Sequence, residues 1–147
     1  MLRHKKSGNL FGFTLVEIMI VVAIIVIIAS MTIPGILRSR LNANEAGAIT
    51  SLKTISWAAI TYRTVNPAYP INISELSSSD PSYIDSVLST GIKQGYAFNL
   101  EGSTNFFNIT AQPLVPNITG VRYFYVDTGG VIKASSSGPA NSSSPTI

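Results

Sequence analysis

The sequence predicts an α+β fold in which one long N-terminal α-helix packs against a small antiparallel β-sheet of three to four strands. Three observations predict this fold. An apolar segment follows a short basic stretch, an amphipathic segment with apolar residues at steps of four and three comes next, and period-two alternation begins near residue 94. The 147 residues are enough for one modest domain beside the apolar segment.

The apolar segment has the length and composition of a membrane span. It runs from Phe13 to Ile33, which is 21 residues. From Ile18 onward its only residues that are not apolar are Ser30 and Thr32. About 20 such residues cross a hydrocarbon core of roughly 30 Å. We therefore expect residues 13–34 to form a transmembrane helix.

The charge distribution indicates an orientation in the membrane. Ten Lys and Arg residues against seven Asp and Glu residues give a net charge of +3, and this excess lies in Arg3, Lys5 and Lys6. Positive charge before a span keeps that end in the cytoplasm, so the C-terminal part is expected outside. Because the remainder is formally neutral, no nucleic-acid partner is inferred. The chain has no Cys, so the outer domain must be held by packing.

Hydropathy alone leaves more than one kind of N-terminal segment open. A cleaved secretory signal fits poorly, because the apolar run exceeds the 7–15 residues of such signals and no small-x-small cleavage site follows it. An uncleaved signal-anchor fits better. Such an anchor would display a monomeric binding or hydrolytic domain outside the membrane.

The residues at the start of the span resemble a known processing site. The stretch Gly12-Phe13-Thr14-Leu15-Val16-Glu17, behind a basic leader, is similar to the cleavage site of type IV prepilins and of the pseudopilins of type II secretion systems. The resemblance covers roughly residues 1–65. It implies that residues 1–12 are a cytoplasmic leader, removed after Gly12 by a membrane prepilin peptidase that also methylates the new amino group of Phe13.

The resemblance also gives the acid inside the span a role. Glu17 lies one helical turn after Phe13, and an ionisable residue within a membrane segment is a functional-site hypothesis by default. The resemblance implies that Glu17 pairs with the Phe13 amine of a neighbouring subunit, since either charge alone is costly in a low dielectric. An intrachain pair is geometrically awkward. The remaining alternative is a Glu whose stem reaches toward the headgroups.

Pro34 and Gly35 end the apolar segment. Proline within a helix removes a backbone donor and crowds the carbonyl four residues back, here that of Ser30. Either the helix stops here, or it continues with a kink while Ser30 and Thr32 help to satisfy the freed backbone groups. The resemblance implies the kinked continuation, and it implies that this segment melts when subunits pack into a filament.

The amphipathic segment predicts that the helix continues to about Thr64, before the stop signal Asn66-Pro67. One stripe of this segment is apolar except for Glu45; its members are Leu41, Glu45, Ala48, Leu52, Ile55, Ala59 and Tyr62. Together with the sheet, this half of the helix is expected to form a pilin-like head over residues 35–134.

Residues 67–91 are expected to be the connecting αβ loop of that head. Within it, Pro81 to Leu88 predicts a short helix, because Asp80 is an N-cap candidate and proline suits the first helical position.

The sheet is expected over residues 94–134, with its Phe and Tyr positions buried against the helix. Alternation places residues 96, 98 and 100 on one face of a first strand and residues 107, 109 and 111 on one face of a second. Residues 121–126 and 131–134 predict the remaining strands. The pattern from Ala111 to Ile132 also resembles the C-terminal sheet of some cysteine-free pilin-like proteins. Residues 135–147 are rich in Ser and are expected to be a flexible tail.

The sequence shows no catalytic constellation. His4 is the single histidine and lies in the leader, so His-based triads and His metal sites are excluded in a processed chain. No enzymatic activity and no cofactor are expected. Asp80, Asp85 and Asp127 are weak candidates for a calcium site, Asp127 foremost, because the family's major pseudopilins bind calcium in a C-terminal loop. Turn and cap roles are the expected alternative.

These observations favour a structural subunit of a type IV pilus or pilus-like filament. The resemblance implies identical or related subunits, the prepilin peptidase and methyltransferase, an inner-membrane assembly platform and membrane lipid as partners. It implies the bacterial inner membrane, with the C-terminal domain periplasmic, before transfer to a pilus or periplasmic pseudopilus. The alternative is a major-type pseudopilin of a type II secretion system, and a monomeric anchored binding domain is less favoured.

Overall fold

The computed structural model describes residues 12–147. Except for Gly12, the predicted leader lies outside these residues. Contacts divide the chain after Leu37 into an N-terminal unit and a C-terminal unit, Arg38–Ile147.

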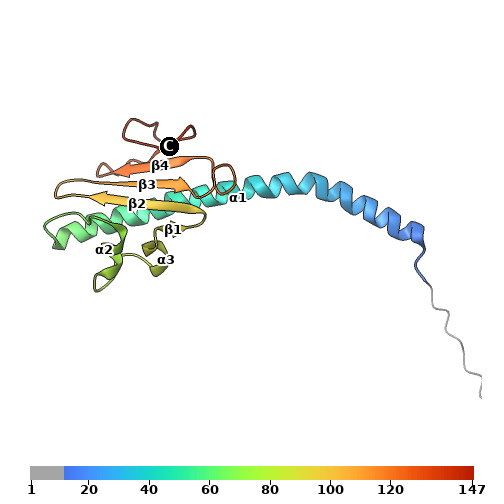
Figure 1. Ribbon diagram of the computed structural model, residues 1–147, viewed down its shortest axis with the longest axis horizontal. Helices are drawn as coiled ribbons and strands as arrows, with labels where there is room; N and C mark the ends of the chain where they lie inside the picture. Colours follow the sequence, from blue (N-terminus) through green and yellow to red (C-terminus); the bar gives the residue numbers. More distant parts are fainter. Residues whose placement is uncertain (1–11) are drawn as a thin grey trace, which may run out of the picture. The chain divides into compact units, whose positions relative to one another are not determined.

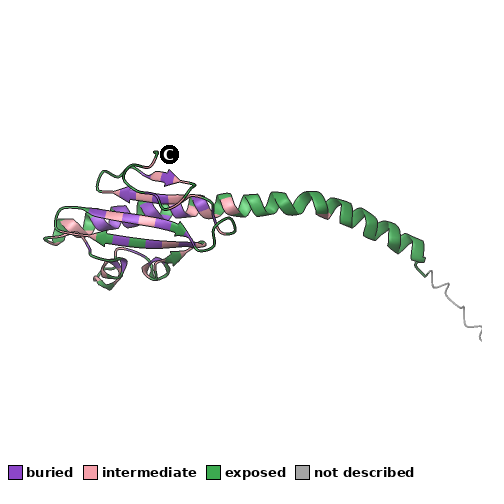
Figure 2. Ribbon diagram, turned by 45° about the horizontal axis from the view of Figure 1, so that its top comes forward, coloured by how far each residue is buried: buried purple, intermediate pink, exposed green. Residues whose placement is uncertain are grey.

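One continuous helix, α1 (Leu15–Val65), contributes to both units. Its bounds confirm the predicted long helix, and it contains Pro34 in its interior. The N-terminal unit consists of the first half of α1 and the residues before it, and its helical side chains are almost all exposed (Figure 2). The predicted continuation past Pro34 is therefore the arrangement observed.

The C-terminal unit contains a five-stranded antiparallel sheet whose strands follow the sequence order, β1-β2-β3-β4-β5. Figure 1 shows the central strands lying along the second half of α1. The strands are β1 (Ile92–Lys93), β2 (Tyr96–Gly102), β3 (Phe107–Pro113), β4 (Tyr123–Asp127) and β5 (Lys133–Ser135).

The predicted number of three to four strands is wrong because β1 was missed. At two residues, β1 is too short to show an alternating pattern. It pairs with β2 through a tight turn whose central residues, Gln94 and Gly95, have φ values of 50° and 76°. Positive φ at both central positions is characteristic of a type I′ hairpin turn, in which Asn-Gly is the usual signal. Gln94-Gly95 is a weaker form of that signal.

The core lies between the buried face of α1 and one face of the sheet. From α1 it takes most of the predicted stripe, including Ala48, Leu52 and Ile55. From the sheet it takes the predicted alternating residues of β2 and β3, which are Tyr96, Phe98, Leu100, Phe107, Ile109 and Ala111. Figure 2 shows buried positions alternating with intermediate or exposed ones along the strands.

Not every Phe and Tyr of the sheet is buried, contrary to the expectation. Strand β4 buries Phe124 and Val126, which leaves Tyr123 and Tyr125 half-buried on the outer face. Phe106 precedes β3 and is 59% exposed. Period two requires this outcome, because alternate residues of a strand point to opposite faces of the sheet.

The connecting region contains two short helices, α2 (Ile73–Ser78) and α3 (Ser86–Ser89). The prediction of a helix from Pro81 to Leu88 capped by Asp80 is wrong, since α3 begins later and Asp85 caps it by accepting the Leu88 N–H at 2.7 Å. Proline suits a turn as well as a helix start, so Pro81 alone does not distinguish these two structures. Helix α2, capped by Asn72, was not predicted.

The Ser-rich C-terminal segment differs from the flexible tail that composition predicted. It lies against the last strand, where the Ala134 N–H donates to the Pro145 carbonyl at 2.8 Å and the Ile147 N–H donates to the Ile132 carbonyl at 3.3 Å. Ala140 is only 6% exposed. Backbone pairing and one small buried side chain hold a segment whose composition contains few apolar residues.

Candidate assembly site

The first half of α1 presents an apolar surface that nothing in its own unit covers. Large apolar side chains from Leu15 to Leu37 are about half exposed or more, and Phe13 is 85% exposed. Among the described residues, α1 is the one helix long and apolar enough to cross a membrane. Such a helix, apolar all round, needs either lipid or other helices around it.

Glu17 closes a capping box at the start of α1. Its Oε2 accepts the Thr14 backbone N–H at 2.8 Å and the Thr14 hydroxyl at 2.7 Å, and the Glu17 N–H donates to Thr14 Oγ1 at 3.2 Å. Thr14 is the residue before the helix, so this is the Thr-x-x-Glu arrangement that satisfies free N–H groups at a helix start. The Thr-x-x-Glu pattern can be read from the sequence, but the resemblance drew attention to the charge of Glu17 and not to its capping role.

The capping box gives Glu17 a partner within its own chain. Gly12 and Phe13 lie just before it, outside the helix, and both are exposed. The predicted sites of cleavage and methylation are therefore adjacent to the carboxylate. The predicted pairing of Glu17 with a neighbour's Phe13 amine needs a second subunit, so it stays a prediction.

Pro34 and Gly35 lie inside α1, and the nearby hydroxyls bind carbonyls one turn earlier. Ser30 Oγ donates to the Ile27 carbonyl at 2.8 Å, and Thr32 Oγ1 donates to the Ile28 carbonyl at 2.9 Å. Neither hydroxyl compensates the Ser30 carbonyl, the acceptor that Pro34 leaves without its donor. The predicted melting of this segment on assembly stays a prediction.

Glu45 is the acid of the buried stripe, and the structure gives it a role that the sequence did not reveal. It is 6% exposed. Its Oε1 accepts the backbone N–H groups of Val121 at 2.9 Å and Arg122 at 3.1 Å, while its Oε2 accepts from Arg122 Nε at 2.7 Å. We call these three residues the Glu45 anchor. The anchor ties α1 to the connection between β3 and β4.

The electrostatics of the Glu45 anchor favour the ionised carboxylate. Burial by itself would raise the pKa of Glu45, but the Val121 N–H and the Arg122 side chain and N–H outweigh it and hold the pKa below its usual value. Nearby, the Tyr96 hydroxyl donates to the Arg122 carbonyl at 2.8 Å. Burial of this ring is the main reason that the pKa of Tyr96 is raised.

The weak calcium candidates do not come together. The Asp85 carboxylate caps α3 and pairs with Lys93 Nζ at 2.7 Å, and Asp127 Oδ1 accepts the Gly129 N–H at 2.9 Å. Within residues 12–147, no three acidic or histidine side chains form a group that could hold a metal ion. Asp85 and Asp127 have the cap and turn roles that were the expected alternative.

The fold and the N-terminal helix together define a pilin-like protein: an apolar helix whose second half packs against a small antiparallel sheet. No family model matches the sequence. The chain is 36% identical over 66 residues to the type II secretion system core protein G of Vibrio cholerae. That match spans 45% of this chain and 45% of the relative, so it covers less than half of either protein.

The similarity and the fold agree with the resemblance carried by Gly12 to Glu17. Both are consistent with the family of type IV pilins and type II secretion pseudopilins.

Proposed function

We propose that this protein is the structural subunit of a type IV pilus or pilus-like filament. The observation that carries the proposal is the exposed apolar half of α1, which begins at a capped carboxylate, Glu17. Subunits that bury these helices against one another remove a large apolar area from water or lipid while forming a polymer. The role is structural, and no enzymatic activity is proposed.

Processing prepares the subunit for this assembly. A prepilin peptidase of the inner membrane cuts after Gly12 and methylates the Phe13 amine, which leaves a cation four residues from Glu17. The Glu17 carboxylate then exchanges its bonds to Thr14 for the Phe13 amine of a neighbouring subunit. Since either charge alone is costly in a low dielectric, pairing selects one axial register. Pro34 and Gly35 supply the point where the helix melts during packing.

Before assembly, the subunit lies in the bacterial inner membrane with its N-terminus in the cytoplasm. The basic residues before the span support this orientation. An assembly platform in that membrane then moves the C-terminal unit, which is periplasmic, into the growing filament.

The second candidate is the major-type pseudopilin of a type II secretion system. The similarity to the type II secretion system core protein G of Vibrio cholerae favours it. Both candidates use the same assembly mechanism, and they differ in the machinery that surrounds the filament. A monomeric anchored binding domain would need no charged partner for Glu17, so the assembly assay below separates it from both.

Two substitutions at Glu17 separate its charge from its cap. Glutamine still closes a Thr-x-x-Gln capping box but carries no charge, whereas alanine removes both. We expect Glu17→Gln and Glu17→Ala to insert and to be cleaved normally, yet both to lose filaments in a shear-and-pellet assay. Asp85→Asn, a matched loss of one charge in the C-terminal unit, should assemble normally. Normal filament yield from Glu17→Gln would refute the charge pairing and leave only the cap.

A further inference from the structure

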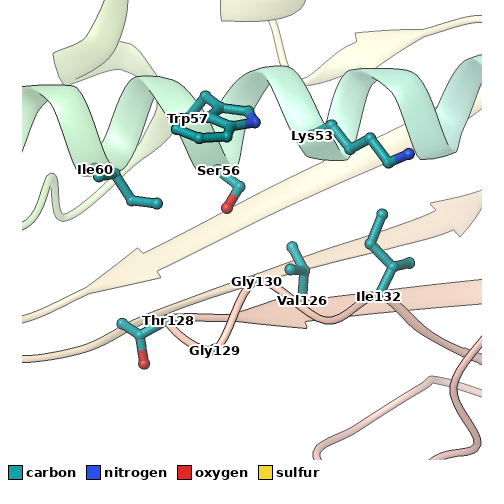
Figure 3. Close-up of a pocket in the computed structure, with 9 residues that line it drawn as sticks. All are labelled: Lys53, Ser56, Trp57, Ile60, Val126, Thr128, Gly129, Gly130 and Ile132. Atoms are coloured by element: carbon teal, nitrogen blue, oxygen red, sulfur yellow. The ribbon is translucent and has the colours of Figure 1, made fainter.

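A groove of about 260 Å³ lies in the C-terminal unit between α1 and the turn that joins β4 to β5 (Figure 3). The helix contributes Lys53, Ser56, Trp57 and Ile60, and the turn contributes Thr128 to Gly130. In Figure 3, Val126 and Ile132 point from the sheet side toward the helix and form the apolar floor. We call this surface the Trp57 groove.

The Trp57 groove has the composition of a protein-binding surface. Trp57 is the single tryptophan of the chain and is 70% exposed, and Ile60 beside it is 37% exposed. Tryptophan, together with Tyr and Arg, is enriched among the few residues that dominate binding energy in protein interfaces. Within residues 12–147, the two salt bridges are Lys93–Asp85 and Arg122–Glu45, so the Lys53 charge has no carboxylate partner there.

A complementary surface lies on the outer face of the β2–β3 hairpin. Glu101 pairs in register with Asn108, so Glu101 and Phe106 are diagonal neighbours on the same face. Phe106 is 59% exposed, and the Glu101 carboxylate accepts a hydrogen bond only from the neutral Asn99 side chain, at 3.1 Å, among the described residues. This pair, the Phe106 face, presents an aromatic ring beside an unpaired acid.

Four of the five other acids of the C-terminal unit, all except Asp80, are already engaged. Glu45 and Asp85 form the two salt bridges, while Glu75 and Asp127 each accept a backbone N–H. Glu101 is the acid that combines an exposed carboxylate with an exposed aromatic neighbour on a strand. The Phe106 face, an aromatic ring beside an acid, is therefore complementary in charge to Trp57 beside Lys53.

We propose that the Trp57 groove of one subunit binds the Phe106 face of a second copy of this chain, with Phe106 against Trp57 and Glu101 paired with Lys53. Charge complementarity selects this occupant and its orientation. The two surfaces are different parts of the chain, so each copy offers one of each. A heterologous contact of this kind is the type from which open helical filaments are built, as the proposed filament requires.

This contact rests on the proposed filament and adds which parts of the C-terminal units meet. The chain has no cysteine, so paired cysteines report the contact without background. Thr128 on the groove and Thr104 on the hairpin are both exposed polar residues. In cells that produce the protein with its assembly machinery, Thr128→Cys combined with Thr104→Cys should give a ladder of disulfide-linked oligomers on mild oxidation.

Matched variants make the ladder specific to the contact. Neither single cysteine variant should form a ladder, and neither should Thr128→Cys with Ser82→Cys, which moves the second thiol to an exposed position in the connecting region. In the ladder-forming background, Lys53→Glu or Glu101→Lys should each lower the cross-linked fraction about tenfold, because like charges then face each other. Their combination should restore the ladder by reversing both charges.

The outcomes separate this contact from the filament itself. Normal filaments from the Thr128 and Thr104 double-cysteine variant without a ladder would overturn the contact and leave the proposed function standing. A ladder from the Ser82 control, or charge reversals that fail to restore each other, would also overturn it. No filaments from the unmodified chain would overturn the proposed function and the contact together.

Discussion

The Glu45 anchor gives the sharpest prediction about the C-terminal unit. Glu45→Gln keeps the size of the side chain and one acceptor oxygen, but replaces the other oxygen with an NH₂ group. In either orientation of the amide, that NH₂ faces donors, which are the Arg122 guanidinium or the backbone N–H groups of Val121 and Arg122. The substitution therefore removes the ion pair and leaves buried donors without acceptors.

The size of the effect follows from the burial of each partner. A buried donor without a partner costs about 1–3 kcal/mol. The Glu45 side chain is 8% exposed, but the Arg122 side chain is 43% exposed, so water partly solvates the guanidinium and reduces its share of the loss. We expect Glu45→Gln to lower the free energy of unfolding by about 2 kcal/mol.

Urea unfolding of the full chain in detergent, followed by near-ultraviolet circular dichroism, measures this change. The midpoint should fall by about 1 M, given the urea dependence of small domains. Asp85→Asn is the matched control, since it removes the charge from the exposed Asp85–Lys93 pair while Asn still caps α3. It should leave the midpoint nearly unchanged. Equal midpoints for both variants would refute the claim that the Glu45 anchor stabilises the unit.

Three further predictions concern the same unit. Folding lowers the pKa of Glu45, so the carboxylate adds to the free energy of unfolding above the ordinary carboxyl pKa of about 4.3. This contribution is lost as pH falls below that value. The urea midpoint should therefore fall less steeply in acid for Glu45→Gln than for the unmodified chain. Gly102→Ala should lower the free energy of unfolding by about 1–3 kcal/mol, because its methyl group would meet the Pro70 backbone carbonyl. Gly47→Ala is the contrast, because its methyl group meets only the flexible end of the Gln94 side chain. It should leave the free energy of unfolding unchanged or raise it by up to about 1 kcal/mol. Deleting residues 140–147 should lower stability by about 1–2 kcal/mol, because it removes two backbone hydrogen bonds to the β5 region; a midpoint unchanged by the deletion would contradict a packed C-terminal segment.

Long periodic segments were predictable from the sequence. The 3.6-residue stripe that includes Leu52 and Ile55 gave the second half of α1, and strict alternation gave the inward faces of β2 and β3. These signals are strong because many residues repeat the same choice between a buried and an exposed side. The short elements carry too few residues for such repetition, which is why β1 and α2 were missed.

The polar contacts were less predictable than the apolar core. Glu45 stood out as the acid on a buried stripe, but its partners Val121 and Arg122 lie more than 70 residues away in sequence, and only the fold brings them together. The capping box at Thr14 and Glu17 is local and readable from the sequence alone. The C-terminal segment shows the limit of composition, because backbone hydrogen bonds to β5 do not depend on which side chains the segment carries.

We propose that cleavage after Gly12 converts a membrane-anchored precursor into a filament subunit. Intact-mass measurement of protein recovered from sheared filaments tests it most directly. We expect a single chain that begins at N-methylated Phe13. Assembled protein that retains Met1, or protein found only as unassembled chains in the membrane, would contradict it.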